Sequence, residues 1–464
     1  MHSGLKIIVP AVSQLAVVIT FLLTLITPPA AASQDNSSAK QVERAASLIR
    51  DNRIAEAEQQ LNYVLKASPN HAIALNLLGT VRAMQGKLNE AEALFSRAIR
   101  IDNQLVGAHM NLAYLYLLKG APEKTALALR EVLRLDPNNA DASHKLAWLM
   151  LSQHQYDACI SFIETAKQSQ AVSAPLLTAL GEAYLRKGDV DKAEKNYLLA
   201  LNDHSSNADA LLGLARVSQA RGDARAATLY LGRARSVIVD SPDLLYKFAL
   251  VALSSNLFDD AMLTLKRAIE LRPAEPSYHF VLGVTWLKKP DLQEAEQAFR
   301  QSLKLQPDNA SAQVHLGYAL LKQKKVAEAR EWLEKSIQKS TGAPEPFYYL
   351  GLIAQEQNEN ERAIEFFEKA IQLSPSFAHA HIALGSTYLK LKNYPRAQQE
   401  LETGVRLSPD DSKGHYNLAL LYARLKDPDR AQAEMQIVER LKSARGQAED
   451  NDLVSPSSTG VRQQ

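Results

Sequence analysis

Apolar and small residues recur along this chain with a fixed period of 34 residues, twelve times without an insertion, from Ser38 to Arg445. With Ser38 as position 1, positions 4, 7, 8 and 11 of each unit share one face of a helix, and so do positions 20, 24 and 27. A short polar break such as Gln85-Gly86-Lys87 separates the two stretches. The pattern therefore predicts 24 helices in antiparallel pairs over residues 38–445, and no strand.

The sizes of the repeated side chains indicate how each pair packs. Position 20 is alanine except at Thr125 and Cys159, and position 7 is Leu or Phe in eleven units. Small residues let two helix backbones approach closely, and large ones fill the space beside them. Position 8 is always small: Ala45, Gly79, Ala113, Ala147, Gly181, Ala215, Ala249, Gly283, Gly317, Gly351, Gly385 and Ala419. Position 24 is always large and apolar: Leu61, Phe95, Leu129, Ile163, Tyr197, Leu231, Leu265, Phe299, Leu333, Phe367, Leu401 and Met435.

Prolines mark the ends of several second helices, because proline cannot continue a helix. They are Pro137, Pro273, Pro307, Pro375 and Pro409. This pattern resembles the tetratricopeptide repeat (TPR), most closely around Leu282-Gly283, Ala295, Phe299 and Pro307. The resemblance implies an all-α, right-handed solenoid of helix pairs with a concave binding surface.

Three residues depart from the family pattern. Thr125 and Cys159 stand where alanine is usual, and we expect Cys159 to be a buried structural thiol. Arg44 stands at position 7, where the other units are apolar. An end repeat lacks a neighbour on one side, so a charge there fits a solvated cap.

The first 37 residues do not follow the repeat. Lys6 precedes the uncharged run Ile7–Thr27, and Ala30-Ala31-Ala32 follows it. This order is typical of a cleaved signal peptide over residues 1–32, while the length of the run also fits an uncleaved membrane anchor. Both alternatives place the repeats outside the cytoplasm, periplasmic or secreted after cleavage. Residues 33–37 are expected to be a linker, and 446–464 a disordered polar tail.

Composition and motifs argue against several classes of function. The 53 basic and 51 acidic residues give a net charge of +2, which offers no reason to expect a nucleic-acid partner. One cysteine excludes an internal disulfide. The chain has no G-x-S-x-G, phosphate loop or H-E-x-x-H, and its 11 histidines are scattered. We therefore expect no catalytic residue, no cofactor and no metal site.

The family resemblance implies that positions 2, 5, 9 and 12 of the first helices line the concave surface. The residues that this assigns to a partner-binding groove are Met110, Tyr114, His144, Trp148, Tyr246, Phe280, Tyr318, Tyr348 and Tyr416. Aromatic side chains of this kind are common anchors for peptides. The alternative is that they pack adjacent first helices together. The Lys/Asn carboxylate clamp of some relatives is missing, and so is the asparagine ladder of others, since Asn76 is the only asparagine at the ladder positions.

These observations favour a non-enzymatic protein-interaction scaffold of the cell envelope or secreted space. It would bind a protein or peptide segment in an aromatic and aliphatic groove, and would meet a membrane only through an uncleaved N-terminal segment. The alternative is a structural or regulatory subunit of an envelope assembly or export complex, of the pilus or polysaccharide type.

Overall fold

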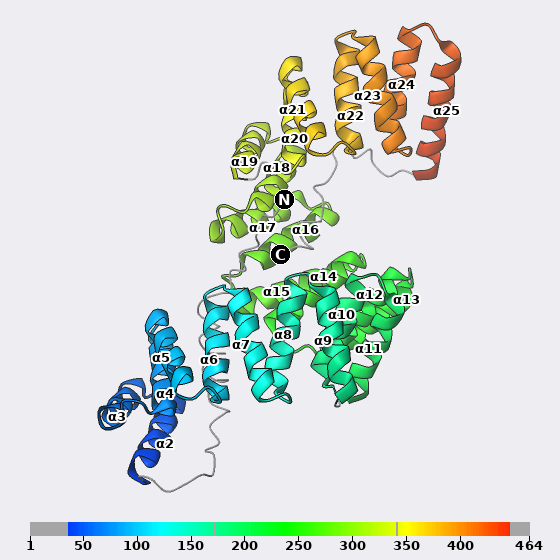
Figure 1. Ribbon diagram of the computed structural model, residues 1–464. Coiled ribbons are helices and arrows are strands. Elements are labelled where there is room, and N and C mark those ends of the chain that lie inside the picture. Colours follow the sequence, from blue (N-terminus) through cyan, green and yellow to red (C-terminus); the bar gives the residue numbers. More distant parts are fainter. Residues whose placement is uncertain (1–35, 170–171, 204, 340–341, 446–464) are drawn as a thin grey trace. The chain divides into compact units, whose positions relative to one another are not determined.

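The computed structural model describes residues 36–169, 172–203, 205–339 and 342–445 (Figure 1). These residues form 24 helices and no strand, as the period predicts. The proposed signal or anchor segment and the polar tail lie outside the described residues. The first helix begins at Asn36, two residues before the first repeat. The chain divides into two compact units, Met1–Val237 and Ile238–Gln464.

The described part of the first unit contains six helix pairs. Its helices are α2 (Asn36–Arg50), α3 (Ile54–Ala67), α4 (Ala72–Met84), α5 (Leu88–Ile101), α6 (Val106–Leu118), α7 (Pro122–Leu135), α8 (Ala140–Ser152), α9 (Tyr156–Ser169), α10 (Ala174–Arg186), α11 (Val190–Asp203), α12 (Ala208–Ala220) and α13 (Ala224–Val237). The first helices of neighbouring pairs also pack together, as α8 with α10 and α10 with α12.

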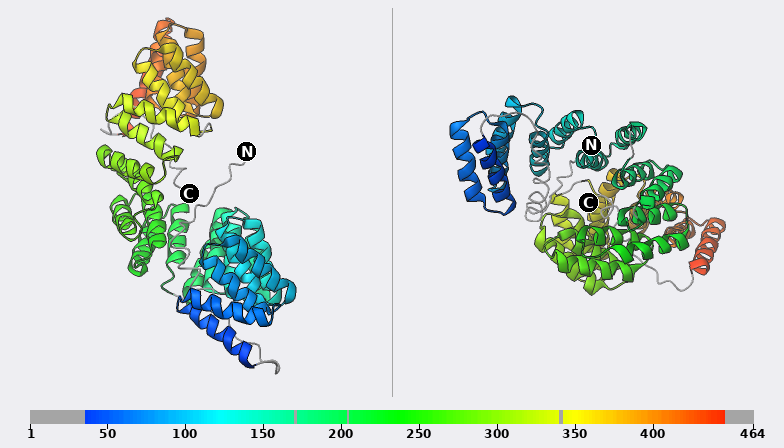
Figure 2. Two further views of the ribbon diagram at one scale, coloured as in Figure 1. Left: turned by 90° about the vertical axis from the view of Figure 1, so that its left-hand side faces the viewer. Right: turned by 90° about the horizontal axis from the view of Figure 1, so that it is seen from below.

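The described part of the second unit repeats the same arrangement six times. Its helices are α14 (Pro242–Ser254), α15 (Phe258–Leu271), α16 (Pro276–Lys288), α17 (Leu292–Leu305), α18 (Ala310–Lys322), α19 (Val326–Lys339), α20 (Glu345–Glu356), α21 (Asn360–Leu373), α22 (Ala378–Lys390), α23 (Tyr394–Leu407), α24 (Ser412–Arg424) and α25 (Pro428–Arg445). Figures 1 and 2 show stacked helix pairs within each unit.

Position 8 is small because position 24 lies directly against it. A Cβ atom added to Gly351 would lie 2.5 Å from Cε1 of Phe367, and one added to Gly283 would lie 2.6 Å from the same atom of Phe299. Every aromatic residue at position 24 faces a glycine in this way, the other two pairs being Gly79 with Phe95 and Gly181 with Tyr197. The close approach predicted from residue size is confirmed.

The residues that depart from the repeat pattern differ in their burial. Arg44 is exposed, as a solvated end requires. Cys159 is fully buried, and burial raises the pKa of its thiol to about 12, so it is a neutral packing residue. Met435 is 37% exposed, whereas the other eleven side chains at position 24 are buried. No described helix follows α25 to cover Met435.

The residue at position 15 adopts a positive φ in all twelve repeats and ends the first helix. These residues are Asn52, Gly86, Gly120, His154, Gly188, Gly222, Asn256, Pro290, Lys324, Asn358, Lys392 and Lys426. A left-handed residue after a helix lets its N–H bond back to the last turn, as Gly86 does to the carbonyl of Ala83 at 3.0 Å. Proline has no N–H, and its ring favours φ near −65°, whereas Pro290 has a φ of 22°.

We expect Pro290→Gly to raise the stability of the second unit by about 1 kcal/mol or more, because glycine adopts a positive φ freely and restores the missing donor. Thermal or urea unfolding followed by helical circular dichroism measures the gain. Asn358→Gly is the matched control, since asparagine already tolerates this conformation. Equal effects of the two substitutions would show that Pro290 is not strained.

Candidate functional site: an apolar pocket between α6, α7 and α8

The nine residues assigned to the groove differ in accessibility. Trp148, His144 and Tyr416 are exposed and Tyr246 is partly buried. The remaining five are buried: Met110, Tyr114, Phe280, Tyr318 and Tyr348. Four of the nine belong to the first unit and five to the second.

In the second unit the buried members pack within and between the repeats. Phe280 is fully buried, and its ring centroid lies 5.8 Å from that of Phe299 and 5.1 Å from that of His315. The ring centroid of Tyr348 lies 5.5 Å from that of Tyr349 and 5.2 Å from that of Phe377. Phe280 and Tyr348, both at position 5, therefore pack against neighbouring side chains, whereas Tyr416 at the same position is exposed.

In the first unit three of the nine residues meet at one pocket of about 270 Å³, where α6, α7 and α8 adjoin. Tyr114 comes from α6, and His144 and Trp148 from α8. Met110 is buried one helical turn before Tyr114. The complete lining is Ala113, Tyr114, Leu117, Thr125, Leu129, His144, Lys145, Trp148 and Leu149. Trp148 is 44% exposed, so a large apolar side chain is accessible to solvent at an apolar pocket.

The polar side chains around Tyr114 are bonded to one another. The Tyr114 hydroxyl donates to Oδ2 of Asp141 at 2.6 Å. Nζ of Lys145 lies 4.8 Å from the centre of the Tyr114 ring and 3.4 Å from Oδ1 of Asp141. Burial and the bond to Asp141 raise the pKa of Tyr114 well above its usual value, so the hydroxyl stays a neutral donor. This network fixes one wall of the pocket.

Thr125, which departs from alanine at position 20, lies in the lining of this pocket, and its hydroxyl donates to the carbonyl of Ala121 at 3.0 Å. This departure from the repeat is a signal for the pocket in the sequence. The sequence did not single out Leu117, Leu129, Lys145 or Leu149 as a group, because they come from different positions of two repeats.

In the repeats of the first unit that follow Trp148, the residues at position 9 are charged. Glu182 on α10 accepts hydrogen bonds from Arg186 at 2.7 Å, Arg216 at 2.6 Å and the Tyr197 hydroxyl at 3.0 Å. Burial alone would raise the pKa of Glu182, but the two guanidinium groups outweigh it and lower the pKa to about 2. Position 9 of the first unit is occupied in turn by Ala46, Thr80, Tyr114, Trp148, Glu182 and Arg216, so its large apolar residues are confined to Tyr114 on α6 and Trp148 on α8.

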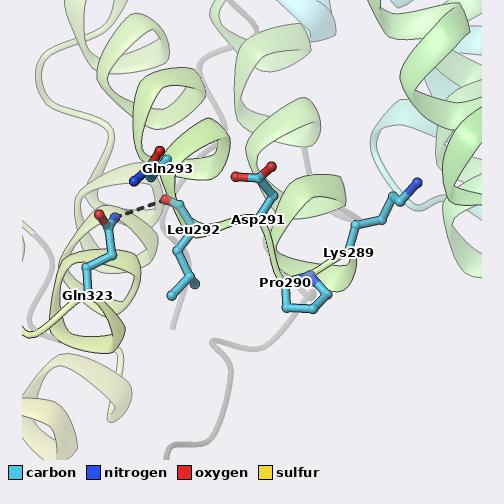
Figure 3. Close-up of a pocket in the computed structure, with 6 residues that line it drawn as sticks. All are labelled: Lys289, Pro290, Asp291, Leu292, Gln293 and Gln323. Atoms are coloured by element: carbon cyan, nitrogen blue, oxygen red, sulfur yellow. Dashed lines mark hydrogen bonds between the residues drawn. The ribbon is translucent and has the colours of Figure 1, made fainter.

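A second depression, of about 480 Å³, lies in the second unit where α16 joins α17 (Figure 3). Its lining is Lys289, Pro290, Asp291, Leu292, Gln293 and Gln323. Gln323 donates through Nε2 to the carbonyl of Leu292 at 3.0 Å, the bond drawn in Figure 3. Asp291 caps α17 by accepting from the N–H of Glu294 at 3.1 Å. These polar groups support the turn, and the depression lacks an exposed aromatic side chain.

In the part of the chain that the structure describes, no group of three or more His, Cys, Asp or Glu side chains is arranged to hold a metal ion. No helix in the same ranges is both long enough and apolar enough to cross a membrane.

The fold places this chain in the class of helical repeat proteins, which are built from stacked pairs of helices. Within this class the chain belongs to the tetratricopeptide repeat family. Models described as tetratricopeptide repeat match residues 42–105, 128–161, 176–207 and 354–415. A model described as the cytochrome c-type biogenesis protein H TPR domain matches residues 250–381.

Curated relatives are distant and longer. Human protein O-mannosyl-transferase TMTC3 is 24% identical over 198 residues, 41% of this chain and 21% of that protein. Cellulose synthase 1 operon protein C of Komagataeibacter xylinus is 24% identical over 243 residues, 49% of this chain and 18% of that protein. The chain therefore spans about a fifth of the length of these relatives.

Two solved structures are among those similar to this chain. A tetratricopeptide repeat protein from Parabacteroides merdae is 18% identical with a TM-score of 0.46, covering 54% of this chain and 99% of that chain. PilF of Pseudomonas aeruginosa is 22% identical with a TM-score of 0.40, covering 44% of this chain and 92% of that chain.

Proposed function

We propose that this protein is a non-enzymatic scaffold of the cell envelope or secreted space that binds a protein or peptide partner. The pocket between α6, α7 and α8 would take an apolar side chain of that partner. The observation that carries the proposal is the exposure of Trp148 at an apolar pocket. Other position-9 residues such as Val284 and Tyr318 are buried against their neighbours. Tryptophan is enriched among the residues that dominate binding energy.

The size and chemistry of the pocket favour a side chain over a free small molecule. Its volume of about 270 Å³ is below the ~300–1,000 Å³ of usual small-molecule sites. Its walls are mainly aliphatic and aromatic, and the Tyr114 hydroxyl is already bonded to Asp141. A partner side chain that brought an unpaired polar group into this pocket would lose hydrogen bonds to water, so an apolar side chain fits better.

Location and pathway rest on separate observations. Lys6 before the apolar run Ile7–Thr27 supports an extracytoplasmic location. The match to a cytochrome c-type biogenesis TPR domain and the likeness to a cellulose synthase operon protein favour the second candidate, a subunit of an envelope assembly or export complex. Both candidates use the same surface.

We expect Trp148→Ala to weaken partner binding by about 2 kcal/mol, close to thirtyfold, with the helical content unchanged. A photo-crosslinking residue in place of His144 identifies the partner from envelope extract, and titration of the purified pair then gives the dissociation constants. High salt should change them little, because screening acts on exposed charges.

Leu127→Ala is the matched control for this test. Leu127 is an exposed leucine on α7 that does not line the pocket, so its loss should leave binding nearly unchanged. If Trp148→Ala binds as the unaltered protein does, or if Leu127→Ala is the more damaging change, the pocket does not hold the partner.

A further inference from the structure

Four histidines occupy position 4 of their repeats and make the same contact. Nε2 of each faces a backbone carbonyl six residues earlier, in the turn that enters the repeat. The acceptors are the carbonyl oxygens of Asn103 for His109 (3.2 Å), Pro273 for His279 (3.2 Å), Pro375 for His381 (3.1 Å) and Pro409 for His415 (3.0 Å). A carbonyl only accepts, so this contact is a hydrogen bond when Nε2 carries a proton.

The last two of these histidines face a second acceptor. Nδ1 of His381 lies 2.6 Å from Oε2 of Glu400, and Nδ1 of His415 lies 2.6 Å from Oε2 of Glu434. Both carboxylates stand at position 23, where the repeats of His109 and His279 carry alanine. A neutral imidazole has one N–H and can serve one acceptor, whereas the imidazolium serves both.

The surroundings of His381 favour its charged form. The hydrogen bond to Glu400 raises the pKa of His381, burial opposes this, and the Pro375 carbonyl and the charge of Glu400 add to the rise. Arg406, also on α23, acts in the opposite direction. The net pKa lies above the usual 6.5. The stabilisation is therefore fully present below about pH 6.5 and is lost as the pH rises through the folded-state pKa.

We propose that His381 and Glu400 form a pH-sensitive latch that joins the turn entering α22 to the second helix α23, closed while His381 is an imidazolium and released when it loses its proton. His415 and Glu434 repeat this geometry between the turn entering α24 and helix α25. Each repeat of a solenoid contacts only its neighbours, so release of the His381 latch loosens the repeat of α22 and α23 without unfolding the others. The latch is independent of the pocket on α6–α8.

Two measurements on the full chain test the latch. Hydrogen exchange read by mass spectrometry at pH 6 and pH 8.5, corrected for the intrinsic rates, should show a severalfold loss of amide protection in α22 and α23 at the higher pH. The helices α4 and α5 serve as the internal reference. Nitrogen NMR of labelled histidine should show both ring nitrogens of His381 protonated at pH 6.

Glu400→Gln keeps the size of the side chain and removes its charge, so protection in α23 should be low and nearly independent of pH. Glu402→Gln is the matched control: Glu402 lies on the same helix but accepts from the Tyr422 hydroxyl at 3.0 Å, and its loss should leave the pH dependence intact. Unchanged protection of the original chain between the two pH values, a singly protonated His381 at pH 6, or a normal pH response in Glu400→Gln would each overturn the proposal. The NMR result stands even if the variant fails to fold.

Discussion

Replacing Gly351 by leucine is expected to destabilise the pair α20–α21 by about 3 kcal/mol, the upper range of overpacking effects. Even the first added carbon would lie 2.5 Å from the Phe367 ring, and the ring is fully buried with little room to move. Residue-resolved hydrogen exchange measures the loss better than one global melt, because the repeats unfold in a graded manner.

Gly232→Leu is the control for this prediction. Gly232 lies inside α13, and no atom lies within 4 Å of the position of an added Cβ. Leucine has a higher helix propensity than glycine by roughly 0.8 kcal/mol, so this variant should be as stable as the original or more so. In Gly351→Leu, the further change Phe367→Ala should recover part of the loss, since the two side chains compete for one space. Similar losses at Gly351 and Gly232 would contradict this account of position 8.

Lowering the pH from 7 to 4 is expected to cost the second unit up to roughly 3 kcal/mol through His315 alone. His315 is buried, with its ring 5.1 Å from that of Phe280 and 5.5 Å from that of Phe299. Its Nδ1 lies 2.8 Å from the carbonyl of Ser311, while Nε2 has no hydrogen-bond partner among the described residues. Burial lowers the pKa of His315 to about 4.

The direction of this change in stability follows from the protonation of His315 in the folded and unfolded states. Between pH 6.5 and 4 the unfolded chain binds a proton at this residue and the folded chain does not, so stability falls as the pH falls through this window. Urea unfolding across this pH range, compared between the original chain and His315→Leu, isolates the effect from other titrating groups. His381 acts in the opposite direction and is present in both chains. If the two chains lose the same stability on acidification, His315 does not titrate as its surroundings indicate.

The sequence by itself determined the helix pairs and their internal packing. Helix faces follow from spacings of three and four residues, and the paired sizes at Gly351 and Phe367 act within one repeat, so both are readable along the chain. The family assignment rests on the same periodicity. Even the burial of Cys159 followed from its position in the unit.

Only the tertiary structure decided which first-helix residues are accessible. Trp148 and Tyr318 share position 9, yet the first is 44% exposed and the second is buried. His279 and His381 share position 4, yet only His381 meets a carboxylate, that of Glu400. The 34-residue period fixes which face of a helix a residue occupies. Accessibility and pairing depend on how closely each repeat packs on the next, which is set by side chains from different helices, and a single repeat does not contain that information.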